Sequence, residues 1–217
     1  MNRFEKVAVL GGGAFGVALA KLAAERSGQV SFWARNEETC LHINRFHHHP
    51  TKLSNILLPA NIHATSNLAE ALKNAKVVIL ALPIKALNEV LLSAKNYFED
   101  AIIVCTAKGI EENTLSLSCD ILSRCLPKSL SHKSCYLSGP SFAIELALGL
   151  PTALTLASLD KAAGLYFQEG FSRKNCRLYR SEDVVGVCAS GALKNVIAIA
   201  SGACVGLKLG RNALASL

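Results

Sequence analysis

The sequence predicts an α/β protein in which a mostly parallel, doubly wound sheet is followed by the start of an all-helical domain. Three observations support this fold class. Short apolar, β-branched segments alternate with helical patterns, which is the order expected of parallel strands joined by helices. A cluster of glycines follows the first of these segments directly. After Arg180 no further strand pattern occurs, and a long helix rich in small residues begins.

Seven segments have the composition of buried strands. Each is rich in aliphatic or aromatic residues and is bounded by helical or turn patterns. They are KVAVL (6–10), QVSFWA (29–34), KVVILAL (76–82), AIIVCT (101–106), CYLS (135–138), TALTLA (152–157) and CRLYR (176–180). We therefore predict that residues 1–180 form a first domain. Residues 181–217 would be the first helix of a second domain, with Ser181 as N-cap and acidic residues in its first turn.

The glycine cluster GGGAFG at residues 11–16 fits the pattern G-x-G-x-x-G, directly after a strand and at the start of a helix. In that context Gly11 permits a tight turn, Gly13 lets a diphosphate approach the backbone, and Gly16 lets helix and strand pack closely. The alternative is that these glycines serve only a sharp turn. The context favours a Rossmann-type, dinucleotide-binding fold for residues 1–180.

The end of the second strand segment indicates which dinucleotide is bound. An acidic residue about 20 positions after the glycines binds the ribose 2′-hydroxyl of NAD, whereas an arginine suits the 2′-phosphate of NADP. Here Arg35 stands 19 positions after Gly16, and Glu37 and Glu38 come later, where they would open the next helix. The sequence thus predicts NADP or NAD as cofactor, with NADP favoured. Alternatively, Arg35 is a surface cation stacked on the adenine.

Composition favours a cytoplasmic protein with small anionic ligands. The net charge of +7 is spread over 217 residues without a basic run, which argues against nucleic acid as a partner. The eight cysteines include no C-x-x-C pair, so we expect reduced, buried thiols and no metal site. Consecutive helical residues cannot converge on one ion, so we expect the tract His47 to His49 at a solvated helix end.

Residues 184–207 form an apolar stretch long enough to span a bilayer, with Lys194 as its only charged residue. A central lysine is costly in lipid, so we expect a buried helix of a soluble protein and no membrane span. A buried lysine must pair, reach water or lower its pKa. With a lowered pKa, Lys194 could donate a proton to a carbonyl oxygen as hydride reaches the carbon, which makes it the candidate catalytic residue.

Other candidate residues follow the strands, where ligands gather in open α/β sheets. Lys108 comes just after the segment 101–106, and Gly139 and Ser141 lie between a strand segment and a helix start. Each has a structural alternative: a solvated lysine, a simple turn, and an N-cap.

Four segments together resemble the bacterial NAD(P)-dependent glycerol-3-phosphate dehydrogenases. They are GGGAFGVALA, AKGIEENT, LSGPSFAIELALGLPTA and GVCASGALKNVIAIASG, in that order and spacing. The resemblance implies a cytoplasmic oxidoreductase that reversibly reduces dihydroxyacetone phosphate to sn-glycerol 3-phosphate, a precursor in phospholipid biosynthesis and lipid metabolism.

The same resemblance implies roles for individual residues. Lys194 would donate and accept the proton and bind substrate, and Lys108 would contact both cofactor and substrate. Gly139 and Ser141 would line the substrate. The remaining cofactor contacts would come from Ala14, Phe15, Arg35 and Ala143, beside the glycines of the loop.

The chain departs from the family pattern in several places. Ile84 and Ile144 stand where the family commonly has a small polar residue and a lysine, and Val205 replaces a common aspartate. From the resemblance we expect most of the family's C-terminal helical substrate domain to be missing. The apolar face of the C-terminal helix would then need a partner surface, so we expect a homodimer through this helix as one way to cover it. Two alternatives stay open: a non-catalytic NADP-binding fragment, and another lysine-dependent two-domain dehydrogenase.

Overall fold

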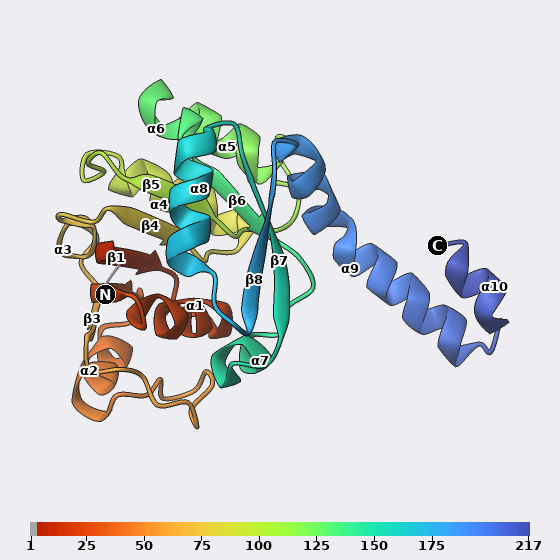
Figure 1. Cartoon of the computed structure of the whole chain (residues 1–217), viewed down its shortest axis with the longest axis horizontal. Helices are drawn as coiled ribbons and strands as arrows, with labels where there is room; N and C mark the ends of the chain where they lie inside the picture. Colours follow the sequence, from red (N-terminus) through yellow and green to blue (C-terminus); the bar gives the residue numbers. More distant parts are fainter. Residues whose placement is uncertain (1–3) are drawn as a thin grey trace.

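An eight-stranded sheet lies at the centre of the structure, a computed structural model that describes residues 4–217 (Figure 1). The strand order is β3-β2-β1-β4-β5-β6-β7-β8, and neighbouring strands are parallel except β6 and β7. The strands are β1 (Phe4–Leu10), β2 (Ser27–Trp33), β3 (Ile62–Thr65), β4 (Val77–Leu80), β5 (Ile102–Cys105), β6 (Cys135–Ser138), β7 (Thr152–Ser158) and β8 (Cys176–Ser181). The predicted α/β class and mostly parallel sheet are confirmed.

Helices cover both faces of this sheet. One buried cluster joins the sheet to α1, α2, α7 and α8, and a second joins the opposite face to α3, α4, α5, α6 and the beginning of α9. The helices are α1 (Ala14–Ala24), α2 (Glu37–Phe46), α3 (Leu68–Leu72), α4 (Ile84–Ala94), α5 (Ser118–Cys125), α6 (Lys128–His132), α7 (Ala143–Leu148), α8 (Lys161–Phe171), α9 (Val184–Gly206) and α10 (Gly210–Ala215).

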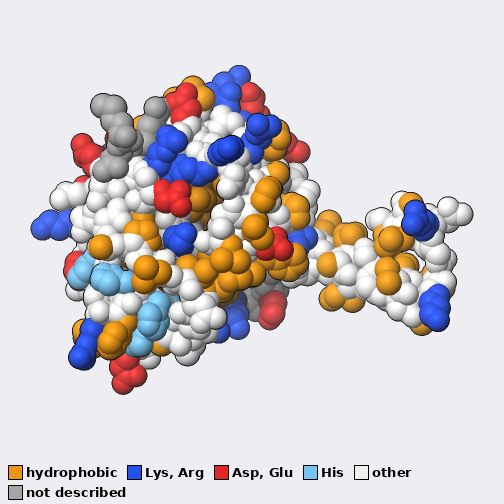
Figure 2. Space-filling model, turned by 60° about the horizontal axis from the view of Figure 1, so that its bottom comes forward, with side chains coloured by type: hydrophobic (Ala, Val, Ile, Leu, Met, Phe, Trp, Pro, Cys, Tyr) orange, Lys and Arg blue, Asp and Glu red, His pale blue; other side chains and the backbone are white. Residues whose placement is uncertain are grey.

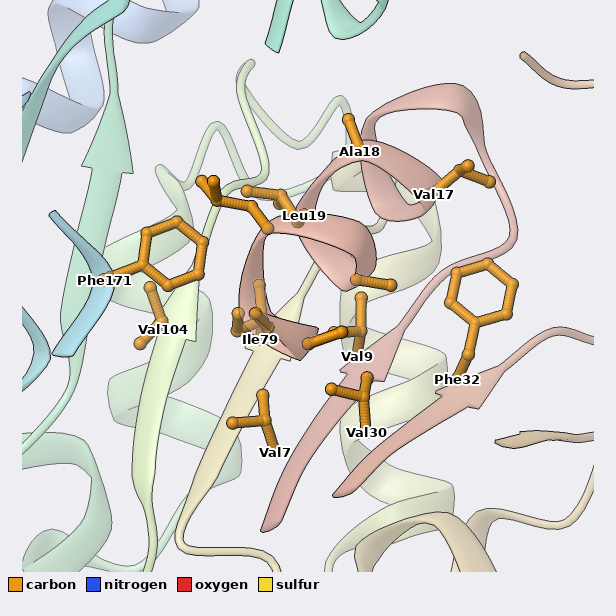
Figure 3. Close-up of a cluster of buried hydrophobic side chains, with 14 of the residues drawn as sticks. Val7, Val9, Val17, Ala18, Leu19, Val30, Phe32, Ile79, Val104 and Phe171 are labelled. Atoms are coloured by element: carbon orange, nitrogen blue, oxygen red, sulfur yellow. The ribbon is translucent and has the colours of Figure 1, made fainter. Parts of the chain in front are cut away.

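The two clusters follow from the alternation of side chains along buried strands. In β1, Val7 and Val9 belong to the cluster beneath α1, whereas Ala8 and Leu10 belong to the cluster on the other face. Figure 3 shows α1 lying over the first face, with Leu19 above the strand side chains. Each fully buried large side chain stabilises the fold by about 1.5–3 kcal/mol.

All seven predicted segments form strands, but the sequence analysis missed β3. This strand has four residues, lies at the edge of the sheet and pairs only with β2 among the described strands. The exposed His63 interrupts its apolar residues, so the segment lacks the continuous apolar run that marks the central strands.

The long C-terminal helix begins close to the expected position. Strand β8 ends at Ser181 and α9 begins at Val184. The N-cap is Asp183 rather than Ser181, because the Asp183 carboxylate accepts a hydrogen bond from the Gly186 N–H at 2.8 Å. The Ser181 hydroxyl instead accepts from the Asp183 N–H at 3.1 Å. The division into domains 1–180 and 181–217 stays a prediction.

The expectation that α9 is a buried helix is wrong for this structure. Only Val184, Cys188 and Gly191 are buried, all in the first turns that touch the body. Figure 1 shows the rest of α9 projecting from the body, with α10 folded back beside its far end. Figure 2 shows hydrophobic side chains on the surface of this projection. Among the described helices, α9 is the one long and apolar enough to cross a membrane, and 17% of its apolar window is buried.

Candidate active site

The glycine-rich loop has the geometry that its spacing predicts. Gly11 has a φ of +134°, and a β-carbon there would overlap the carbonyl oxygen of Ala81 after β4. A β-carbon on Gly16 would overlap the carbonyl oxygen of Gly11, so α1 approaches the end of β1 this closely only with glycine. These two glycines therefore shape the loop and its contact with the sheet.

Gly13 differs because, beyond its two chain neighbours, no atom lies within 4 Å of the position that its β-carbon would take. It is the N-cap of α1, and its carbonyl accepts the Val17 N–H at 3.0 Å. The open space therefore lies at the N-terminus of a helix, where backbone N–H groups and the helix dipole favour an anion such as a diphosphate.

A cleft of about 740 Å³ opens above this loop, at the carboxyl ends of the strands. Most of the predicted cofactor residues line it: Gly11, Gly13, Ala14, Phe15, Arg35, Lys108 and Ala143. Gly16 is not in the lining, because it lies buried under the loop. Ser141 also lines the cleft, and its buried hydroxyl oxygen has no hydrogen-bond partner in the structure. An open cradle at Gly13 and an unpartnered hydroxyl in the same cleft fit a bound dinucleotide.

Arg35 follows β2 at the rim of the cleft and is exposed. The next residue, Asn36, caps α2 by accepting the Thr39 N–H at 2.7 Å, and Glu37 and Glu38 lie in the first turn of that helix, as expected. Arg35 therefore lies directly before the start of α2, in the wall of the cleft.

The predicted substrate residues lie in two adjoining cavities. Lys108 and Ser141 line the large cleft, whereas Gly139 and Lys194 line a neighbouring pocket of about 380 Å³. Lys108 connects the two, because its Nζ donates a hydrogen bond to the Gly139 carbonyl at 2.8 Å. The structure therefore brings the candidate residues together around Lys108.

The surroundings of Lys108 lower its pKa. Burial lowers the pKa of Lys108, and the positive charge of Lys194 lowers that pKa further. Lys194 itself is half-buried rather than fully buried, because α9 leaves the body soon after this position. The expectation of a buried lysine in the apolar helix is thus wrong for Lys194.

Gly191 lets α9 approach this site, and the sequence analysis did not single it out. A β-carbon at Gly191 would lie 2.8 Å from the Ser138 hydroxyl and 3.6 Å from the Lys108 Cγ. The available signal was its position three residues before Lys194, on the same helical face. Gly191 and Ser138 thus hold the base of α9 against the strand that precedes Gly139.

The histidine tract does not form a simple solvated end. His47 is the C-cap of α2 in the left-handed conformation and His48 is half-buried, but His49 is 4% exposed and lines the large cleft.

All eight cysteines are free thiols and six of them are buried. No group of three or more metal-binding side chains occurs within residues 4–217.

Comparison with known proteins identifies the family. The family model for the NAD-dependent glycerol-3-phosphate dehydrogenase N-terminus matches residues 6–164, and the model for its C-terminus matches residues 183–217. Glycerol-3-phosphate dehydrogenase [NAD(P)+] of Myxococcus xanthus (strain DK1622) is 42% identical over 96% of the chain and 63% of the relative. The enzyme of the same name from Fusobacterium nucleatum is also 42% identical, over 98% of the chain and 63% of the relative.

A solved structure agrees with these relatives. The crystal structure of glycerol-3-phosphate dehydrogenase from Coxiella burnetii superposes with a TM-score of 0.87 at 29% identity, covering 99% of this chain and 65% of that one. The chain thus spans about 63% of the length of the curated relatives it matches. With the N-terminal family model covering most of its residues, the chain belongs to the NAD-dependent glycerol-3-phosphate dehydrogenase family.

Proposed function

We propose that the protein catalyses the reversible reduction of dihydroxyacetone phosphate to sn-glycerol 3-phosphate with NADPH or NADH, NADPH being favoured. Family membership supports this activity. The single observation that carries it is the position of Lys108. Its side chain lines the dinucleotide cleft and donates a hydrogen bond to the carbonyl of Gly139, which lines the neighbouring pocket together with Lys194. A cofactor in the cleft and a substrate in the pocket would thus meet at one side chain.

In this proposal the cofactor lies over the glycine-rich loop, with its diphosphate at Gly13 and the start of α1. Ala14, Phe15 and Ala143 contact it, and Arg35 binds the 2′-phosphate of NADPH. When bound, the nicotinamide supplies a hydride to the substrate carbonyl carbon, or accepts it in the reverse direction.

The chain's own groups handle the proton and the phosphate. As hydride reaches the carbonyl carbon, the C=O π electrons move to oxygen and take a proton from Lys194 Nζ, which gives the alcohol. In the reverse direction the amine takes that proton back. Lys108 keeps positive charge beside the substrate, while Gly139 and Ser141 line it. Two cations close together suit a phosphorylated, dianionic substrate.

The test is NADPH oxidation with dihydroxyacetone phosphate, measured for the purified chain and for Lys194→Ala, with NADPH binding followed in parallel. Loss of a positioned general acid slows turnover by about 10²–10⁴-fold. We expect the variant to lose turnover and keep its cofactor affinity. Equal turnover by both proteins would contradict the role of Lys194. Preference for a 2-oxo acid over dihydroxyacetone phosphate would indicate another lysine-dependent dehydrogenase.

A second candidate function is NADP binding without turnover. The observation that favours it is the position of Lys194, on a helix that contacts the body only through its first turns. NADPH binding with no substrate-dependent oxidation in either protein would support this alternative. Absence of NADPH binding would contradict both functions.

We also propose that α9 contacts a second copy of the chain, and that the protein is cytoplasmic. Val196 and Ile199 on α9 are exposed, the latter at 75%, and contiguous apolar surface of this kind marks interfaces. Light scattering should give a dimer mass for the purified chain and a monomer mass for Ile199→Lys. A monomer mass for the unchanged chain would contradict the dimer.

The proposed cytoplasmic location is supported by the free thiols, which suit a reducing compartment.

A further inference from the structure

The buried His49 makes three hydrogen bonds that fix its tautomer. Its Nδ1 accepts the backbone N–H groups of Thr51 at 3.2 Å and Lys52 at 3.0 Å. Its Nε2 lies 3.1 Å from the Gly12 carbonyl oxygen. A carbonyl oxygen only accepts and a backbone N–H only donates, so the proton of the neutral ring is on Nε2. The ring therefore joins the segment after α2 to the glycine-rich loop.

The bond to Gly12 acts on the part of the loop that faces the cleft. The Gly12 carbonyl and the Gly13 N–H belong to one planar trans peptide unit, so they point in opposite directions. Holding the carbonyl toward His49 therefore sets the direction of the Gly13 N–H. Gly13 is the N-cap of α1 and lines the cleft, where the proposed diphosphate would lie.

We propose that His49 is a positioning residue for the cofactor: its neutral ring orients the Gly12–Gly13 peptide, and its protonation releases that peptide and weakens dinucleotide binding. The inference rests on the proposed cofactor binding and adds a pH-sensitive group to it. A protonated ring presents an N–H at Nδ1 to the backbone N–H groups of Thr51 and Lys52, so both hydrogen bonds are replaced by repulsion between donors. The ring must then turn, and its Nε2 leaves the Gly12 carbonyl.

The surroundings of His49 favour the neutral ring. Burial lowers the pKa of His49 most, the bond to the Gly12 carbonyl opposes this, and the positive charges of Lys52 and His42 lower the pKa further. Lys52 lies in the same loop and His42 on α2, while the glycine-rich loop contributes no titratable side chain. Arg35 and Lys108 are further cations in the wall of the cleft.

Two substitutions separate the bonds that His49 makes. In His49→Gln the amide N–H can occupy the position of Nε2 and keep the bond to Gly12. This side chain lacks the two bonds made by Nδ1, but it places no N–H against the Thr51 and Lys52 donors and does not titrate. In His49→Asn the amide oxygen can replace Nδ1, but the shorter side chain does not reach Gly12. His48→Gln is the matched control, because His48 is bonded to His42 and not to the glycine-rich loop.

The experiment measures the Kd for NADPH across a pH series with the full chain and its three variants. At alkaline pH, loss of one hydrogen bond in His49→Asn weakens binding by about three- to tenfold. His49→Gln and His48→Gln stay within about twofold of the unchanged chain, since the bond from position 49 to the Gly12 carbonyl is intact in both. Thermal unfolding without cofactor verifies that each variant folds.

The decisive readout is the ratio of the Kd of the unchanged chain to that of His49→Gln, because titration of the cofactor phosphate and of other groups cancels. The ratio is near one at alkaline pH and rises as pH falls below 6.5, the ordinary pKa of histidine, through the lowered pKa of His49. A flat ratio overturns the proposal, and so does a ratio that falls, because the latter means that the charged ring attracts the diphosphate.

The remaining outcomes are also decisive. If neither variant at position 49 folds, His49 is a core residue for the whole fold and the local positioning role is wrong. If the unchanged chain binds no NADPH at any pH, the proposed function fails instead. Binding with a flat ratio contradicts the role of His49 alone.

Discussion

The dinucleotide cleft and the base of α9 are built in different ways. The cleft lies at the ends of several central strands, where Gly11 packs against the Ala81 backbone and Gly16 against the Gly11 carbonyl. Lys194, by contrast, is carried by a helix whose buried residues all lie in its first turns. Under the proposed function, cofactor binding would depend on the body, whereas turnover would depend also on how α9 contacts Lys108 and Ser138. The two properties should separate under mutation.

The largest effect is expected where the cleft is most tightly enclosed. In Gly16→Ala the new methyl group overlaps the Gly11 carbonyl oxygen, so α1 and the loop must move apart. We expect unfolding free energy to fall by about 3 kcal/mol, the upper range for overpacking. Urea denaturation measures this, and NADPH binding should weaken in the same protein.

Gly164→Ala is the matched control, since its β-carbon meets only the Ser158 Cβ at an ordinary 3.5 Å. This helical substitution should stabilise the chain by about 0.5–1 kcal/mol. Equal effects of the two alanines would show that the loop is not tightly enclosed.

A substitution on α9 should affect turnover and leave cofactor binding intact. In Gly191→Leu the side chain pushes α9 away from Ser138 and Lys108. A displacement of about 1 Å can cost 10²-fold in rate, so we expect a loss of that order in NADPH oxidation with dihydroxyacetone phosphate. The NADPH Kd should not change.

Gly202→Leu controls for the effect of leucine in the same helix, because nothing lies within 4 Å of its β-carbon position. It should turn over normally. If Gly191→Leu also weakened NADPH binding, the cleft and the base of α9 would not be separable.

Cofactor choice tests the rim of the cleft alone. Removing a charge-assisted hydrogen bond costs about 1.5–3 kcal/mol, so Arg35→Ala should weaken NADPH binding by tenfold or more. NADH lacks the 2′-phosphate and should bind as before. Arg35→Lys keeps the charge without the planar fork and should lie between the two. Parallel loss of NADPH and NADH affinity would place Arg35 elsewhere on the cofactor.

The smallest effect concerns stability against pH. Because the pKa of Lys108 is lowered below 10.5 in the folded chain, the unfolded chain binds more protons between the lowered value and 10.5. The contribution of Lys108 to stability therefore rises with pH across that window. Relative to Lys108→Met, the unchanged chain should gain unfolding free energy as pH rises, by less than about 1 kcal/mol. Urea denaturation at successive pH values measures the difference, and a constant difference contradicts the lowered pKa.

The sequence predicted the features that local spacing determines. The glycines at 11, 13 and 16 stand within six residues of each other, and the close packing expected at Gly11 and Gly16 is present in the loop. The role of Gly13 toward a diphosphate stays a prediction. Lys108 and Ser141 were placed at the sheet edge because parallel strands present their carboxyl ends together. Their roles toward cofactor and substrate stay predictions.

The features that the sequence did not predict depend on distant contacts. The His49 ring is hydrogen-bonded to the carbonyl of Gly12, 37 residues earlier in the chain. The sequence around the histidine tract gives no sign of this contact. The short strand β3 pairs with β2, which lies more than 28 residues earlier in the chain. Hydropathy predicted a buried α9, but hydropathy cannot state which surface covers a helix, and in the structure most of it is exposed.

The most direct test of the account is NADPH titration of the unchanged chain and of Gly13→Val, with thermal unfolding of both proteins measured without cofactor. Nothing lies within 4 Å of the Gly13 β-carbon position, so the valine fills the space proposed for the diphosphate while α1 keeps its contacts with the sheet. The account predicts that the variant unfolds close to the temperature of the unchanged chain and loses NADPH binding. Equal NADPH affinity in two equally stable proteins would contradict a dinucleotide site at the glycine-rich loop.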